Sequence, residues 1–260
     1  MKPFKMKCKI LLVFIAVCFF NSAMCQIVNV ESKRIQSDSD RFVMNGDFNY
    51  KVLKNNNLRF RTYSGAVTTQ FKSRSLKDTY LILASQDLTR LNEEIISKNW
   101  LVHTRYTRTI SELFKLEVFT QAQQNRVLGI EIRQLNGLGP RIKVFGTKRL
   151  TTYSGTLYML EYQKFFGADE QLTIKHRIST YLSIQASFPN GVGELTSVTY
   201  YQPRLSDFSD RRISNQTSLT FNITSKIAFI NSLNLIFDSR PAKNISTFNF
   251  MVDNGIRIRL

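Results

Sequence analysis

Residues 172–188 read LTIKHRISTYLSIQASF, and apolar and polar side chains alternate along this whole stretch. A period of two is typical of a β-strand with two unlike faces. Strands of soluble sheets usually have about 5–6 residues, whereas a tilted strand that crosses a bilayer needs about 9–11 residues and often extends beyond it. The stretch therefore predicts a membrane-crossing strand. Its apolar face carries Leu172, Ile174, Ile178, Leu182, Ile184, Ala186 and Phe188, with His176 and Thr180 as exceptions.

The same alternation recurs in residues 113–123, 130–144, 213–223 and 248–260. In the last of these, Asn249, Asp253, Arg257 and Arg259 lie opposite the apolar residues Phe248, Phe250, Val252, Ile256, Ile258 and Leu260. One face of each segment is thus apolar, and the other is polar and often charged. The apolar face would turn inward in a soluble exported β-barrel or sandwich that binds an apolar ligand, and outward to lipid in a membrane barrel.

Turn signals between these segments separate about twelve strands, or ten if the break near Asn125–Gly129 is not a turn. Tight connections follow several even-numbered strands, at residues 111–112, 146–148 and 225–226. Looser ones are expected at residues 92–98, 167–170, 206–210 and 239–244. Bacterial outer-membrane barrels have an even strand number, short periplasmic turns and longer outer loops. We therefore predict an all-β, antiparallel up-and-down transmembrane barrel with both termini in the periplasm. The predicted strands are near 41–53, 57–70, 78–91, 99–110, 113–125, 128–145, 149–165, 171–188, 193–205, 211–224, 227–239 and 244–260.

The first 25 residues differ from the rest of the chain. Four lysines precede an apolar run from Ile10 to Phe20, which is too short to span a bilayer as a helix, and small residues follow. This order is typical of a cleavable secretory signal peptide, with Gln26 as the first mature residue. Residues 26–40 are then a short periplasmic lead-in, and residues 41–260 form the barrel. An uncleaved anchor or lipidation of Cys25 are the alternatives.

Cysteine and charge limit the possible partners. All three cysteines lie within residues 1–25, so the mature chain can form neither disulfides nor a thiolate metal site. The net charge of +17 falls to about +13 without the four leader lysines, and the basic residues are scattered singly along the strands. An exported chain meets little nucleic acid, so we expect none as a partner. We expect a monomer in contact with outer-membrane lipid and lipopolysaccharide, inserted by the barrel-insertion machinery through its C-terminal strand.

Aromatic residues near the strand ends are candidates for a girdle at the membrane interfaces. Such residues are Trp100, Tyr106, Tyr162, Tyr200 and Phe208.

Residues that could carry chemistry are few. An outer-membrane hydrolase acting on lipid or peptide would need His103, on the polar face beside Arg105, to meet a Ser or Asp partner. His176 lies on the apolar face, and no His and carboxylate stand at ligand spacing. We therefore assign no catalytic, cofactor-binding or metal-binding residue and expect a non-enzymatic barrel. The alternative is an outer-membrane enzyme that hydrolyses lipid or peptide at a site on the rim of the barrel.

Charged residues on the polar faces of the strands are the candidate functional group. They could form a narrow, net-basic passage that favours anions, or pair across strands inside a plugged, structural barrel. About twelve strands make a barrel narrower than the porins with open channels, which favours the plugged or very narrow interior. The candidate lumen charges are Lys115, Glu117, Glu131, Arg133, Arg141, Lys143, Glu161, Lys175, Arg177, Asp253, Arg257 and Arg259.

Several runs resemble the domain of unknown function 481 family, in particular its Bacteroidetes members. They are residues 99–108 (NWLVHTRYTR), 116–123 (LEVFTQAQ), 137–141 (GLGPR), 155–162 (GTLYMLEY), 198–204 (VTYYQPR) and 238–241 (DSRP). The resemblance covers nearly all of the chain after residue 25 and implies an outer-membrane β-barrel. The family has no established activity, so the resemblance implies no site residue.

Overall fold

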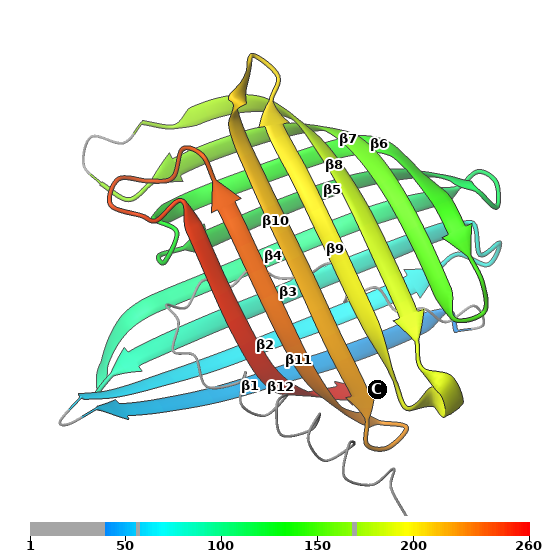
Figure 1. The fold of residues 1–260 in the computed structure, drawn as a ribbon, viewed down its shortest axis with the longest axis horizontal. Helices are drawn as coiled ribbons and strands as arrows, with labels where there is room; N and C mark the ends of the chain where they lie inside the picture. The colour runs from blue at the N-terminus through cyan, green and yellow to red at the C-terminus, as the bar shows by residue number, and fades with distance from the viewer. Residues whose placement is uncertain (1–39, 56–57, 168–170) are drawn as a thin grey trace, which may run out of the picture.

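The computed structural model describes residues 40–55, 58–167 and 171–260, and these form one closed barrel of twelve antiparallel strands (Figure 1). The predicted signal peptide and nearly all of the lead-in lie outside the described residues. Twelve strands rather than ten are confirmed, because residues 126–129 do form a turn. The strands are β1 Phe42–Asn55, β2 Leu58–Lys72, β3 Asp78–Leu91, β4 Glu94–Thr109, β5 Phe114–Asn125, β6 Ile130–Gly146, β7 Leu150–Phe165, β8 Thr173–Ser187, β9 Gly193–Arg204, β10 Asp207–Asn222, β11 Ile227–Asp238 and β12 Phe248–Arg259.

Each strand pairs with its neighbours in the chain, and the last strand closes on the first. The closing contact joins β1 to β12 from Asn45, opposite Arg259, to Phe48, opposite Ile256. Closure matters because an unpaired strand edge in lipid would leave backbone groups without hydrogen bonds. Among the described residues, no helix has the length and apolar character that a membrane span requires.

The apolar face of the strands turns outward. Ile174 and Leu182 of β8 are 52% and 45% exposed, whereas Arg177 between them is 1% exposed. A single closed wall has only two sides, so side chains that are buried here lie inside the barrel. The alternative of a soluble barrel with an apolar interior face is therefore wrong. The protein is a transmembrane barrel with an apolar outer surface and a polar interior.

Two connections are shorter than predicted and one is longer. β4 begins at Glu94 and β10 at Asp207, so the expected loops at residues 92–98 and 206–210 shrink to turns of two residues, 92–93 and 205–206. Asn92 has a φ of 52°, which lets the chain reverse tightly there. The connection at residues 239–247 is longer than expected because β12 begins only at Phe248. This loop lies at the end of the barrel opposite the C-terminus and the start of β1 (Figure 1).

A β-bulge at the start of β6 changes the expected alternation. The pairing between β6 and β7 shifts register between Ile130 and Ile132. Such a bulge adds one residue to one strand and re-aims its side chains. Ile130, expected on the outer face, is fully buried. Glu131, expected to face the lumen, instead pairs with Lys164 at 3.0 Å, and both side chains are more than a third exposed.

Candidate functional site in the barrel interior

Inner side chains of β7 divide the interior into layers. From the end of the barrel with the C-terminus toward the 239–247 loop, the inward positions are Gly155, Leu157, Met159 and Glu161. Leu157, Met159 and Glu161 are each at most 2% exposed. An apolar layer thus lies between Glu161 and a second charged group, centred on Glu117 of β5.

Glu161 is the centre of the charged layer that lies nearer to the 239–247 loop, which we call the upper charged layer. Its carboxylate contacts the guanidinium groups of Arg133 on β6 at 3.0 Å, Arg177 on β8 at 2.5 Å and Arg212 on β10 at 3.2 Å. Arg177 also contacts Asp210 at 2.7 Å, and Asp210 contacts Lys175 at 3.1 Å. The Glu161 side chain is 0% exposed, so these interactions act with little screening by water. The network ties four strands together across the interior.

Arg212 connects this layer to a fifth strand, β11. It contacts Asp238, at the end of β11, at 3.0 Å. Asp238 is the last residue before the 239–247 loop, so the charged layer reaches the base of that loop.

The apolar layer is formed by side chains from five strands. They contact one another inside the barrel and are at most 9% exposed: Phe119, Leu135, Leu157, Met159, Tyr181 and Val198. These side chains give the β5–β9 side of the interior an apolar surface between the two charged layers, and apolar surface opposes the passage of water and ions. Tyr200, which we predicted for the interface girdle, packs against this cluster instead, because its position on β9 points inward.

Glu117 is the centre of the lower charged layer. It accepts a hydrogen bond of 2.8 Å from the Tyr181 hydroxyl and pairs with Arg105 at 3.4 Å and, more distantly, with Arg141 at 3.9 Å. The Arg141 guanidinium lies 3.9 Å from the centre of the Tyr153 ring. Tyr181 can reach across because it lies over Gly155, where a Cβ would stand 2.3 Å from the ring.

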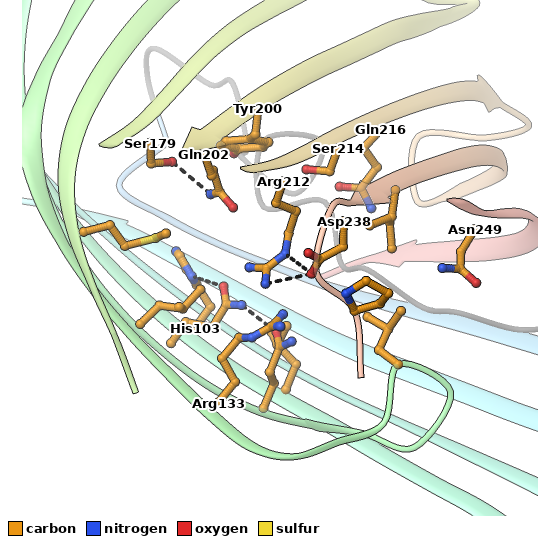
Figure 2. Close-up of a pocket in the computed structure, with 18 of the residues that line it drawn as sticks. His103, Arg133, Ser179, Tyr200, Gln202, Arg212, Ser214, Gln216, Asp238 and Asn249 are labelled. Carbon is orange, nitrogen blue, oxygen red and sulfur yellow. Dashed lines mark hydrogen bonds and ion pairs between the residues drawn. The ribbon is translucent and has the colours of Figure 1, made fainter. Parts of the chain in front are cut away.

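A cavity of about 120 Å³ lies beside the upper charged layer, beneath the 239–247 loop. Figure 2 shows Arg133, Arg212 and Asp238 around this space, with His103, Gln202 and Gln216 on its other sides. The loop closes the cavity from above with the side chains of Pro241, Ala242 and Ile245. Gly129, in the β5–β6 turn, has a φ of 69°, and a Cβ there would stand 2.7 Å from the Ala242 Cβ. The loop thus reaches across the mouth of the barrel to the opposite wall.

Two interactions hold the 239–247 loop at the rim. Ser239 and Arg211 bond twice, through Ser239 N to Arg211 O at 3.0 Å and Arg211 N to Ser239 Oγ at 2.8 Å. Arg240 pairs with Asp207 at 2.5 Å.

His103 is in the interior, as its position on the polar face indicated, but its ring nitrogens are engaged by amide and guanidinium groups. Nδ1 lies 3.0 Å from Gln121 Oε1, and Arg105 Nε donates to Nε2 at 3.3 Å. A guanidinium keeps its protons, so Nε2 is the acceptor and Nδ1 carries the hydrogen. This arrangement does not resemble a histidine that activates a serine. His176 faces outward and bonds to the Tyr158 hydroxyl.

The structure brings most of the predicted lumen charges together, but in separate groups. Arg133, Glu161, Lys175 and Arg177 share the upper layer, while Glu117 and Arg141 share the lower one. Asp253, near the middle of β12, pairs with Lys51 of β1. At the end of the barrel where β1 starts and β12 ends, Arg257 bonds to Asp47 at 2.8 Å. The remaining candidates at that end are half-buried: Lys115, Lys143 and Arg259.

Four charged residues of the two layers were not among the predicted lumen charges, although Arg105 was placed on the polar face beside His103. Arg212 and Arg105 occupy inward positions, and the alternation of their strands could have identified both. Asp210 was assigned to a loop, and Asp238 stands at a strand end where no pattern marks it. In the described part of the chain the buried charges nearly balance, with six arginines and five carboxylates. They are Arg105, Arg133, Arg141, Arg177, Arg212 and Arg257, with Asp87, Glu117, Glu161, Asp210 and Asp253.

A comparison with protein families matches residues 59–253 to the family described as "Protein of unknown function, DUF481". The chain belongs to this family. The match spans the barrel from β2 into β12 and so includes every residue of the two charged layers. A comparison with curated proteins finds no match for this DUF481 chain.

Several solved structures are similar to this DUF481 barrel. The KdgM porin has a TM-score of 0.46 and 10% identity, with 84% of this chain and 98% of that chain covered. The NanC porin has a TM-score of 0.44 and 13% identity, with 84% and 97% covered. The translocator domain of the autotransporter NalP from Neisseria meningitidis has a TM-score of 0.45 and 10% identity, with 84% and 88% covered.

Proposed function

We propose that this DUF481 protein is a non-enzymatic outer-membrane barrel whose interior is closed, so that it is not an open diffusion pore. One observation carries the proposal: every strand contributes a polar or charged side chain that is at most 9% exposed. A water-filled channel, as in larger porins, would leave such inner side chains in contact with solvent. They are Asn45, Thr62, Asp87, Asn99, Glu117, Arg133, Glu161, Arg177, Thr196, Gln216, Asn234 and Asp253.

The proposal includes export and a defined orientation. Residues 1–25 would direct the chain across the inner membrane and be removed before Gln26. Both termini would then lie in the periplasm, and the 239–247 loop would face the outside. The outward Phe248, Phe250, Ile256 and Ile258 of β12 support insertion through the C-terminal strand. The partners would be lipid, lipopolysaccharide and the insertion machinery, and the barrel would be a monomer.

A narrow passage for anions is the second candidate function. It is favoured by the small excess of buried basic charge and by the half-buried Lys115 and Lys175 along the inner wall. The apolar layer opposes it, because the inner surface between the two charged layers is apolar on the β5–β9 side.

Single-channel recording in planar bilayers tests the closed interior. The refolded barrel should insert without producing stepwise currents at either polarity. A variant with Leu135, Leu157 and Met159 all replaced by Ala should produce such steps, because water can then enter the apolar layer. The matched control replaces the outward Leu116, Leu138 and Leu182 by Ala and should stay silent. Stepwise, anion-preferring currents from the unaltered barrel would contradict the proposal and favour the second function.

A further inference from the structure

The upper charged layer contains one more cation than anion. Arg133, Lys175, Arg177 and Arg212 carry four positive charges, and Glu161, Asp210 and Asp238 carry three negative ones. Charges buried this deeply are normally paired. The excess positive charge therefore marks a place where an anion would be stabilised.

Arg133 is the member of the layer with hydrogen-bonding capacity to spare. Its Nε lies 2.9 Å from Gln163 Oε1 and 3.0 Å from Glu161 Oε1. No partner for its two terminal nitrogens is found within residues 40–55, 58–167 and 171–260, although the residue is only 5% exposed. Arg177 and Arg212, in contrast, use their terminal nitrogens on carboxylates. The two terminal nitrogens are not among the fully buried side-chain atoms that lack a partner, because they border the cavity that Arg133 lines. An anion in the cavity could accept hydrogen bonds from them.

The cavity beneath the loop provides the room for that acceptor. Arg133 lines it, and its volume of about 120 Å³ corresponds to roughly four water molecules or one small organic ion. Most of the lining surface is apolar, with Leu135, Leu157 and Met159 below and Pro241 and Ile245 of the loop above. Neutral polar side chains, Gln202 and Gln216 among them, and the carboxylate of Asp238 also line the cavity. In Figure 2 the Arg133 side chain reaches into this space from β6. A guanidinium beside a mostly apolar lining surface suits a ligand with a charged head and an apolar body.

We infer that the cavity binds a small organic monoanion, whose carboxylate lies against the fork of Arg133 and whose apolar body lies against Leu157, Met159 and the 239–247 loop. A planar carboxylate accepts two parallel hydrogen bonds from a guanidinium, a strong and directional pairing. The inference deepens the proposed function. It rests on that function in one respect: in a closed interior, an anion that enters the cavity is bound there and does not pass through the barrel. A conducting barrel that still bound the anion would refute the closed interior alone.

Benzoate and benzamide form a matched pair of probes, because they share one shape and differ in charge. Isothermal titration of the refolded barrel in micelles, with empty micelles as the blank, should show benzoate binding at one site. Benzamide should bind at least about tenfold more weakly, the ratio that one charge-assisted hydrogen bond supplies. Arg133→Gln should weaken benzoate at least about tenfold and leave benzamide unchanged. Arg126→Gln removes a charge at the same end of the barrel, where Arg126 stacks on Phe166 outside the cavity, and should not change benzoate binding.

Three results would overturn the inference: equal affinity for benzoate and benzamide, no benzoate binding, or full affinity in Arg133→Gln. If Arg133→Gln does not refold, Ser214→Leu replaces it as the decisive variant. Ser214 lines the cavity, so a leucine there fills the space while Arg133 stays in place. Benzoate binding should then fall by a similar factor, and retained binding would contradict the site. Inorganic phosphate that displaces benzoate at equal concentration would contradict the preference for an organic monoanion.

Discussion

Replacement of Glu161 by Gln is expected to destabilise the barrel by about 3–5 kcal/mol, the usual effect of removing one partner from a buried ion pair. The side chain is 0% exposed and lies against three guanidinium groups. A neutral amide of the same shape leaves those cations next to one another with no carboxylate between them. Urea unfolding of the barrel refolded into lipid vesicles measures the effect, and tryptophan fluorescence of Trp100 reports it.

Glu131→Gln is the matched control for this substitution. It makes the same chemical change at an acidic residue that pairs with Lys164 on the barrel rim, where both side chains are more than a third exposed. Exposed pairs contribute about 0–1 kcal/mol, so the control should unfold almost like the unaltered barrel. Equal effects of the two substitutions would mean that Glu161 is reached by water, and the interior would then not be closed.

Replacement of Leu182 by Lys is expected to destabilise the barrel by about 2–4 kcal/mol, because it puts a cation into the hydrocarbon near the middle of a spanning strand. Leu182 is 45% exposed on the outer face of β8. The same vesicle unfolding experiment measures this loss.

Ile223→Lys is the control on the outer surface. Ile223 is 65% exposed in the turn between β10 and β11, and a lysine near the membrane interface costs only about 0–1 kcal/mol. A soluble barrel would tolerate Leu182→Lys as well as Ile223→Lys, so equal stabilities would argue against a lipid-facing surface.

The orientation of the side chains could be predicted because a strand has a strict period of two. The opposite faces of Arg177 and Leu182 follow from residues 172–188 alone, and so does the outward face of β12. The period fails where a residue is inserted: the bulge at the start of β6 buried Ile130 and moved Glu131 to the rim. No local pattern marks this bulge, since it depends on how β6 pairs with β7.

The partners of the inner charges could not be predicted from the sequence. Glu161 and Arg212 are 51 residues apart and meet because two strands, β8 and β9, lie between theirs in the closed wall. The distance across the interior depends on the tilt of the strands and on how the inward side chains pack against one another. The alternation of apolar and polar residues gives information on neither. The cavity depends further on the 239–247 loop, whose path over Gly129 is a tertiary contact.

The most direct test of the central claim is a scan of residues 174–183 with single cysteines carrying a nitroxide label, in the chain from Gln26 onward, which has no cysteine of its own. In lipid vesicles, labels at Ile174, Ile178 and Leu182 should collide often with oxygen and rarely with a water-soluble nickel complex. Labels at the inward Arg177, Ser179 and Ser183 should be immobile and reached by neither. A scan without the period of two, or nickel collisions at Ile178 and Leu182, would contradict a closed barrel whose apolar face lies in lipid.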